Sequence, residues 1–113
     1  MASLLIADSG STKTDWCLLT TNHPKKKFHT SGMNPILQTE EQSKQMLKSE
    51  LKINPEEEKL DGIVFYGAGV QNASCQKQME KLLSGYFNCH EVSAHSDLLA
   101  AARATCGVEA GVA

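Results

Sequence analysis

The sequence predicts an α/β domain with a mixed five-stranded sheet and helices on its faces. Three observations lead to this fold class. The apolar and polar segments follow in the order β-β-β-α-β-α-β-α, and a meander followed by alternating helices and strands is typical of a mixed sheet. A chain of 113 residues is long enough for one domain with a buried core. Its residues are 41% hydrophobic, and counting glycine brings the apolar share to the average of globular proteins.

The charge, the hydropathy and the cysteines exclude several classes of protein. The formal net charge is −2, whereas a general nucleic-acid binder needs a basic face. No apolar run approaches the roughly 20 residues that span a bilayer, and no basic segment typical of a signal peptide precedes residues 4–7. We therefore expect a cytoplasmic protein that binds neither nucleic acid nor membrane. In the absence of a Cys-x-x-Cys pair, buried or semi-buried thiols are expected rather than disulfides or zinc ligands at Cys17, Cys75, Cys89 and Cys106.

Three short strands open the chain. Residues 4–7 are a continuous apolar run, residues 14–20 are rich in residues that suit a pleated surface, and residues 28–31 can return as a third strand. Residues 8–11 and 22–27 are turn sequences, rich in polar and small residues. Short strands joined by tight turns predict an antiparallel meander.

Two helices and a buried strand follow. Thr39 can cap the first helix, with Gln42 placed to complete a capping box, and the Asn-Pro pair at 54–55 ends the pattern. Residues 62–67 are an apolar run between glycines, which predicts a central parallel strand. Asn72 can cap the second helix. One helical stripe of this helix comprises Cys75, Met79, Leu82, Leu83 and Tyr86, and Gly85 is expected to stop it.

A fifth strand and a third helix complete the pattern. Residues 90–94 are expected to form the strand. Ser96 can cap a helix that continues through the leucines and alanines of residues 98–104 and stops at Gly107. Residues 108–113 resemble the approach to a further strand, which suggests that the polypeptide continues beyond them.

The turn after the first strand carries the chemistry. Residues 8–15 read Asp-Ser-Gly-Ser-Thr-Lys-Thr-Asp. Small residues let the backbone approach a ligand closely, and successive N–H groups in such a turn can converge on an anion. Lys13 supplies a point charge for a phosphate oxygen, and Asp8 can hold Mg²⁺ through water. The turn thus offers both halves of a metal–nucleotide site. It lacks the spacing of a Walker A loop, and the same residues also suit a hairpin loop without a ligand.

The pattern Asp8-x-Gly10-x-Thr12-x-Thr14 resembles the first phosphate motif of the actin-like superfamily of ATPases and sugar kinases. It falls between the first two strands, where that fold requires it. The resemblance covers essentially the whole chain and implies an RNase H-like fold, because the predicted order of elements is that of the superfamily's N-terminal lobe.

Three further segments narrow the resemblance to the branch that contains N-acetylglucosamine kinase and the BadF/BadG-type ATPases. They are residues 31–35 (Ser-Gly-Met-Asn-Pro), residues 66–70 (Tyr-Gly-Ala-Gly-Val) and residues 96–103 (Ser-Asp-Leu-Leu-Ala-Ala-Ala-Arg). The resemblance implies that ATP and Mg²⁺ are the cofactors and that an amino sugar is the substrate.

The same resemblance assigns roles to single residues. Asp8 corresponds to the acidic residue near the metal, which it would hold through water. Asp97 matches the catalytic aspartate, the base that takes the proton from the attacking sugar hydroxyl. Asn34 matches a position that hydrogen-bonds sugar hydroxyls. The positions matching the turn around the β- and γ-phosphates are Gly10, Ser11, Thr12 and Lys13, and those matching the small-residue loop of the sugar pocket are Gly67, Ala68 and Gly69.

Each role has a structural alternative, and two positions depart from the family. Asp97 suits the first turn of a helix, where the helix dipole favours an acid, and Asn34 before proline is an ordinary turn residue. Asp15 could orient Lys13 or pair elsewhere. Ser9 stands where many relatives have glycine. Gly67 stands where related sugar kinases often have serine, which leaves the identity of the sugar open.

Three functions follow from the resemblance. The leading one is ATP-dependent phosphorylation of an amino sugar. The alternatives are a BadF-type activator, which couples ATP hydrolysis to electron transfer, and a non-catalytic nucleotide or sugar sensor on the same fold. In each case residues 1–113 would be the N-terminal lobe of a larger protein, inactive without the lobe that binds adenosine, with homodimerisation left open.

Overall fold

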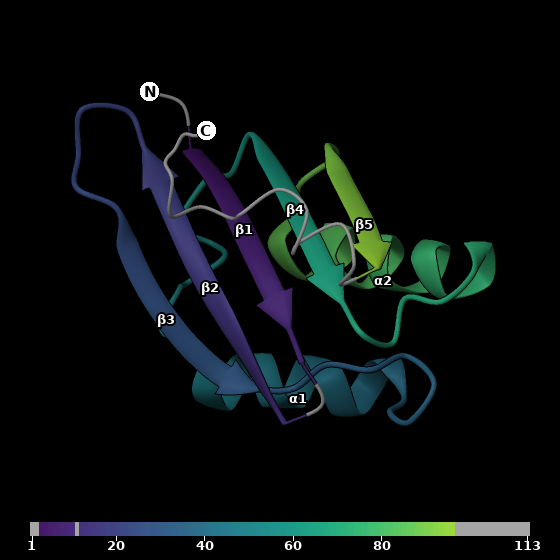
Figure 1. Cartoon of the computed structure of the whole chain (residues 1–113). Helices are drawn as coiled ribbons and strands as arrows, with labels where there is room; N and C mark the ends of the chain where they lie inside the picture. The colour runs from purple at the N-terminus through teal and green to yellow at the C-terminus, as the bar shows by residue number, and fades with distance from the viewer. Residues whose placement is uncertain (1–2, 11, 97–113) are drawn as a thin grey trace.

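The computed structural model describes residues 3–10 and 12–96, which form a five-stranded sheet and two helices (Figure 1). The strands lie in the order β3-β2-β1-β4-β5. β1, β2 and β3 are antiparallel neighbours, whereas β4 is parallel to β1 and β5 is parallel to β4. The mixed α/β sheet predicted from the sequence is confirmed. The strand bounds are Ser3–Ser9 (β1), Lys13–Thr20 (β2), Lys26–Ser31 (β3), Gly62–Gly67 (β4) and Val92–Ser96 (β5).

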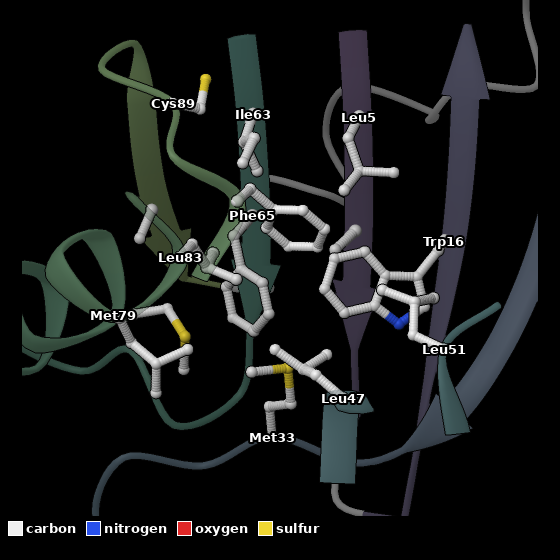
Figure 2. Close-up of a cluster of buried hydrophobic side chains, with 14 of the residues drawn as sticks. Leu5, Trp16, Met33, Leu47, Leu51, Ile63, Phe65, Met79, Leu83 and Cys89 are labelled. Atoms are coloured by element: carbon white, nitrogen blue, oxygen red, sulfur yellow. The ribbon is translucent and has the colours of Figure 1, made fainter. Parts of the chain in front are cut away.

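Both helices pack on one face of the sheet, and the core lies between that face and the helices (Figure 2). Alternation along the strands turns Leu5 of β1 and Phe65 of β4 toward the helices, where neither is exposed. They share one buried cluster with Leu47 and Leu83, which come from the first and second helix. The helix bounds are Glu40–Glu50 (α1) and Ala73–Phe87 (α2).

Trp16 of β2 is the largest side chain of this core. It is 1% exposed, and its ring lies 6.3 Å from that of Phe87, centroid to centroid. Its indole Nε1–H donates a hydrogen bond of 2.9 Å to the Thr30 hydroxyl on β3. The one polar atom of the indole is therefore satisfied inside the core, as buried tryptophan requires.

The predicted caps of both helices are confirmed. The Thr39 hydroxyl accepts a hydrogen bond from the Gln42 N–H, and the Gln42 side chain accepts one from the Thr39 N–H, which completes a capping box. The Asn72 side chain accepts a hydrogen bond of 2.9 Å from the Cys75 N–H. These caps involve residues only three positions apart, so they are readable from local sequence.

The predicted stop at Gly85 is wrong, because α2 continues through it to Phe87. The helix ends instead at Asn88, whose backbone is left-handed with a φ of 54°. A Cβ at Gly85 would meet nothing within 4 Å, so this glycine lies on an open part of the helix surface. The benefit of burying Phe87, which is 2% exposed, outweighs the modest helix penalty of one exposed glycine.

Several other bounds differ from the prediction. β1 extends to Ser9, so Asp8 and Ser9 belong to the strand rather than to the turn. β5 is shifted from residues 90–94 to Val92–Ser96, because its parallel register pairs Val92 with Ile63. α1 ends at Glu50, ahead of the Asn-Pro pair. Ser96 is the last residue of β5, and the third helix expected after it lies outside the described residues.

Three of the four cysteines lie in the described part of the chain and are buried thiols, as predicted: Cys17, Cys75 and Cys89. Cys106 lies outside it. Among residues 3–10 and 12–96, no helix combines the length and the apolar character needed to cross a membrane.

Candidate functional site

Three segments that are distant in sequence meet where β1 and β4 end. The first is the turn between β1 and β2, closed by a hydrogen bond of 2.8 Å from the Gly10 N–H to the Lys13 carbonyl. The second follows β3 and is tied to that turn by the Gly32 N–H, which donates to the Thr12 carbonyl at 3.1 Å. The third follows β4, and its Ala68 N–H donates to the Ser9 carbonyl at 3.1 Å. One edge of the sheet thus joins the turn predicted to bind phosphate to the two segments expected to contact sugar.

The predicted phosphate residues face solvent at this edge. Asp8, Gly10, Thr12 and Lys13 are all exposed, and Asp8 occupies the second-last position of β1. Ser11, also expected to contact phosphate, lies outside the described residues. An exposed carboxylate beside a glycine-containing turn suits Mg²⁺ bound through water, because Mg²⁺ keeps several waters and takes few carboxylates. Within residues 3–10 and 12–96, no three His, Cys, Asp or Glu side chains group closely enough to bind a metal directly.

Asp15 pairs with histidine and not with Lys13. Its carboxylate lies 2.7 Å from Nδ1 of His29, across the β2–β3 pair. Both side chains are largely exposed, at 49% and 70%, so this pair contributes little to stability. The alternative in which Asp15 pairs elsewhere is the one that the structure supports.

Asn34 organises the turn that follows β3. Its side-chain carbonyl oxygen Oδ1 accepts a hydrogen bond of 2.9 Å from the Ile36 N–H, and its own N–H donates to Oε1 of Gln38 at 3.1 Å. The Asn34 backbone carbonyl accepts the N–H groups of Leu37 and Gln38. Because Oδ1 is occupied, the side-chain amide Nδ2 is the group of Asn34 that is left to donate to a ligand.

The small-residue loop after β4 packs directly against Asn34. A Cβ built on Gly69 would collide with the Asn34 side-chain oxygen and would lie 3.0 Å from Cδ of Pro35. A bare backbone at position 69 is therefore what lets the two predicted sugar-binding segments touch. Ala68 lies between the two glycines and is half-buried.

Gly67 has a different reason to lack a side chain. A Cβ at this position would lie 2.5 Å from Cε1 of Phe65, a ring that is fully buried. The serine that the sequence resemblance would place here has no room beside this ring. Glycine at position 67 thus follows from the packing of β4.

One part of the site is not predicted by the sequence. The side chains of Ser9 and Thr14 are both fully buried at the point where the three segments meet. The Thr14 hydroxyl lies 2.8 Å from the Ser9 hydroxyl, which in turn accepts a hydrogen bond of 2.8 Å from the Met33 N–H. A serine among turn-forming residues gave no signal of burial, and only the extension of β1 to Ser9 reveals it. Asp97, the expected base, lies outside the described residues.

Comparison with known proteins finds similarity among the solved structures. No protein-family model matches the chain, and no curated protein matches it. A solved structure from Porphyromonas gingivalis, provisionally named an N-acetylglucosamine kinase, matches with 34% sequence identity and a TM-score of 0.76. The match covers 92% of this chain but 38% of that one. The chain therefore shares the fold of part of a structure named as a sugar kinase. The shared part is 38% of the length of that structure's chain.

Proposed function

We propose that this chain is the N-terminal lobe of an enzyme that transfers the γ-phosphoryl group of ATP to a hydroxyl of an amino sugar, as an N-acetylglucosamine kinase does. The observation that carries the proposal is the meeting of the phosphate turn with the segments at Asn34 and Gly69 on one edge of the sheet. Phosphoryl transfer depends mainly on positioning two substrates and stabilising charge, so a shared edge is the arrangement it needs.

The phosphate end of the proposed site is the turn after β1. The exposed Thr12 hydroxyl would donate to the β- or γ-phosphate, and the exposed Lys13 would neutralise part of their charge. Gly10, Ser11 and Thr12 are the residues of this turn that, in our proposal, contact the phosphates together with Lys13. Asp8 would hold Mg²⁺ through water, which supplies further charge stabilisation to the phosphates.

The sugar end of the proposed site is formed by the Asn34 turn and the loop of Gly67, Ala68 and Gly69. With its oxygen committed to Ile36, the Asn34 side chain would offer the Nδ2–H group to a sugar oxygen. Asp97 would act as the base. The sugar oxygen would form a new bond to the γ-phosphorus, the bond from that phosphorus to the ADP oxygen would break, and the sugar proton would pass to Asp97.

The remaining part of the enzyme would supply the adenosine contacts. The similar structure from Porphyromonas gingivalis is much longer than the stretch it shares with this chain, which supports a second lobe in the parent protein. Residues 1–113 alone would then be inactive, because a site built between two lobes needs both to exclude water and orient ATP.

The test is an ATP-coupled assay of ADP release by the full-length protein across hexoses and N-acetylated amino sugars. We expect ADP release that depends on an amino sugar and yields the sugar phosphate. ADP release without any sugar requirement, or nucleotide binding without turnover, would contradict the kinase and favour the activator or the sensor respectively. Iron and sulfide analysis of anaerobically purified protein separates the activator further.

The variant Asp97→Asn tests the proposed base in the same assay. If Asp97 is the base, the variant should lose turnover by roughly two to four orders of magnitude while it still binds ATP. Unchanged turnover would contradict the role of Asp97 without touching the sugar dependence of the wild-type protein.

A further inference from the structure

We infer that the Ser9 hydroxyl is a positioning residue, which fixes the sugar-binding segment to the strand that carries the phosphate turn. The Ser9 clamp, as we call it, consists of the Ser9 and Thr14 side chains and the backbone N–H and carbonyl of Met33. The inference rests on the proposed function, in which the sugar-binding Asn34, next to Met33, must lie at a fixed distance from the phosphate turn.

The hydrogen bonds of the clamp use every polar site of the Ser9 hydroxyl. Its oxygen accepts from the Met33 N–H at 2.8 Å and from the Thr14 hydroxyl at 2.8 Å. Its own proton has the Met33 carbonyl as nearest acceptor at 3.2 Å, with the Gly10 carbonyl at 3.5 Å as the longer alternative. A hydroxyl has one donor and two acceptor sites, so the set is complete.

Burial makes these bonds consequential. Ser9 and Thr14 are 0% exposed and Met33 is 1% exposed. Without the Ser9 hydroxyl, the Met33 N–H would remain buried with no partner from β1, and an unsatisfied buried donor is costly. Thr14 is less critical, because its hydroxyl can turn to the Ser31 carbonyl at 3.0 Å.

The clamp acts on Asn34 through the chain. Met33 directly precedes Asn34, and its side chain is held in the core while its backbone is held by Ser9. The far side of the same segment is held by Gln38, which accepts from the Asn34 N–H and donates to the Gly32 carbonyl, both at 3.1 Å. Ser9 therefore links the Asn34 turn to β1, whereas Gln38 links the turn to its own backbone and, through the Ser43 hydroxyl, to α1.

The experiment compares Ser9→Ala with Ser3→Ala in the full-length protein. Ser3 is a matched control because it is a buried serine at the opposite end of the same strand, 5% exposed. We expect Ser9→Ala to raise the KM for the sugar about 10-fold to 100-fold while the KM for ATP stays within about twofold. Ser3→Ala should change neither constant. An equal rise in both KM values, or none, would overturn the inference.

Two measurements keep the test decisive if Ser9→Ala folds poorly or the wild-type protein phosphorylates no sugar. Thr14→Val keeps both Ser9–Met33 bonds, so its effect on the sugar KM should be smaller than that of Ser9→Ala. Amide hydrogen exchange at Met33 needs no activity, and Ser9→Ala should accelerate it selectively. Absence of sugar turnover in the wild type would reject the proposed function, whereas unchanged exchange at Met33 would reject the clamp.

Discussion

Asn34 and Asn54 show how one local structure can serve two purposes. Each precedes a proline, accepts through its side-chain oxygen from the N–H two residues on, at 2.9 Å, and accepts through its carbonyl from the next two N–H groups. Asn54 is exposed, whereas Asn34 is half-buried against Gly69. The turn role given as the alternative for Asn34 is thus confirmed, Asn54 forms the same turn, and only its location makes Asn34 the proposed sugar-binding residue.

The duplicated turn provides a sharp test of Asn34. Asn34→Asp keeps an oxygen to accept from the Ile36 N–H but replaces the Nδ2–H donor with a second acceptor. We expect the kcat/KM for the sugar to fall about 10-fold or more, with the KM for ATP unchanged, because a neutral hydrogen bond is lost and a charge approaches sugar oxygens. Steady-state kinetics with each substrate varied measures both.

Asn54→Asp is the control for that variant, since it makes the same change in the same kind of turn at an exposed position outside the proposed site. It should leave both constants unchanged. Wild-type sugar kinetics in Asn34→Asp, or an equal loss in Asn54→Asp, would show that the Asn34 amide does not contact the substrate.

At the scale of single elements, the sequence predicted what local bonds decide and missed what packing decides. The capping box at Thr39 and the cap at Asn72 require only neighbouring residues, and both are confirmed. The end of α2 depends instead on burying Phe87, and the length of β1 depends on pairing Ser9 with both Thr14 and Gly67. No local sequence pattern predicts the burial of Phe87 or the strand pairing of Ser9.

The capping box gives a prediction for α1. Thr39→Ala removes the acceptor of the Gln42 N–H and should destabilise the first turn of α1 by about 1 kcal/mol. Lys44 lies 2.9 Å from Glu40, and this hydrogen bond lowers the pKa of the Glu40 carboxyl, so the ion pair remains available to the variant at neutral pH. Faster amide exchange at the start of α1 measures the effect.

Ser49→Ala is the matched control within α1. Its hydroxyl donates to the Met46 carbonyl at 3.2 Å inside the helix, a bond that competes with helical structure and is not needed for capping. The control should not accelerate exchange in the first turn. Equal acceleration in both variants would mean that the Thr39 cap contributes nothing specific.

At the scale of the whole molecule, the candidate site is a product of topology. The residues that meet at the end of β1 come from three segments, which are brought together because β4 lies parallel to β1 and the segment after β3 contacts Ser9 and Gly69. The sequence predicted the segments themselves through their motifs. It could not predict that Gly69 touches Asn34 or that Ser9 holds Met33, because these contacts join residues more than 20 positions apart and depend on the exact fit of buried atoms.

The central claim is that one edge of the sheet receives both substrates. Hydrogen exchange of the full-length protein, followed by mass spectrometry with N-acetylglucosamine and with a non-hydrolysable ATP analogue plus Mg²⁺, tests it most directly. We expect the sugar to slow exchange at residues 32–35 and 67–70, and the nucleotide to slow it at residues 8–14. Residues 21–25, which follow β2 at the opposite edge, should not change. Protection confined to that opposite edge, or absent from all three segments at saturating ligand, would contradict the account.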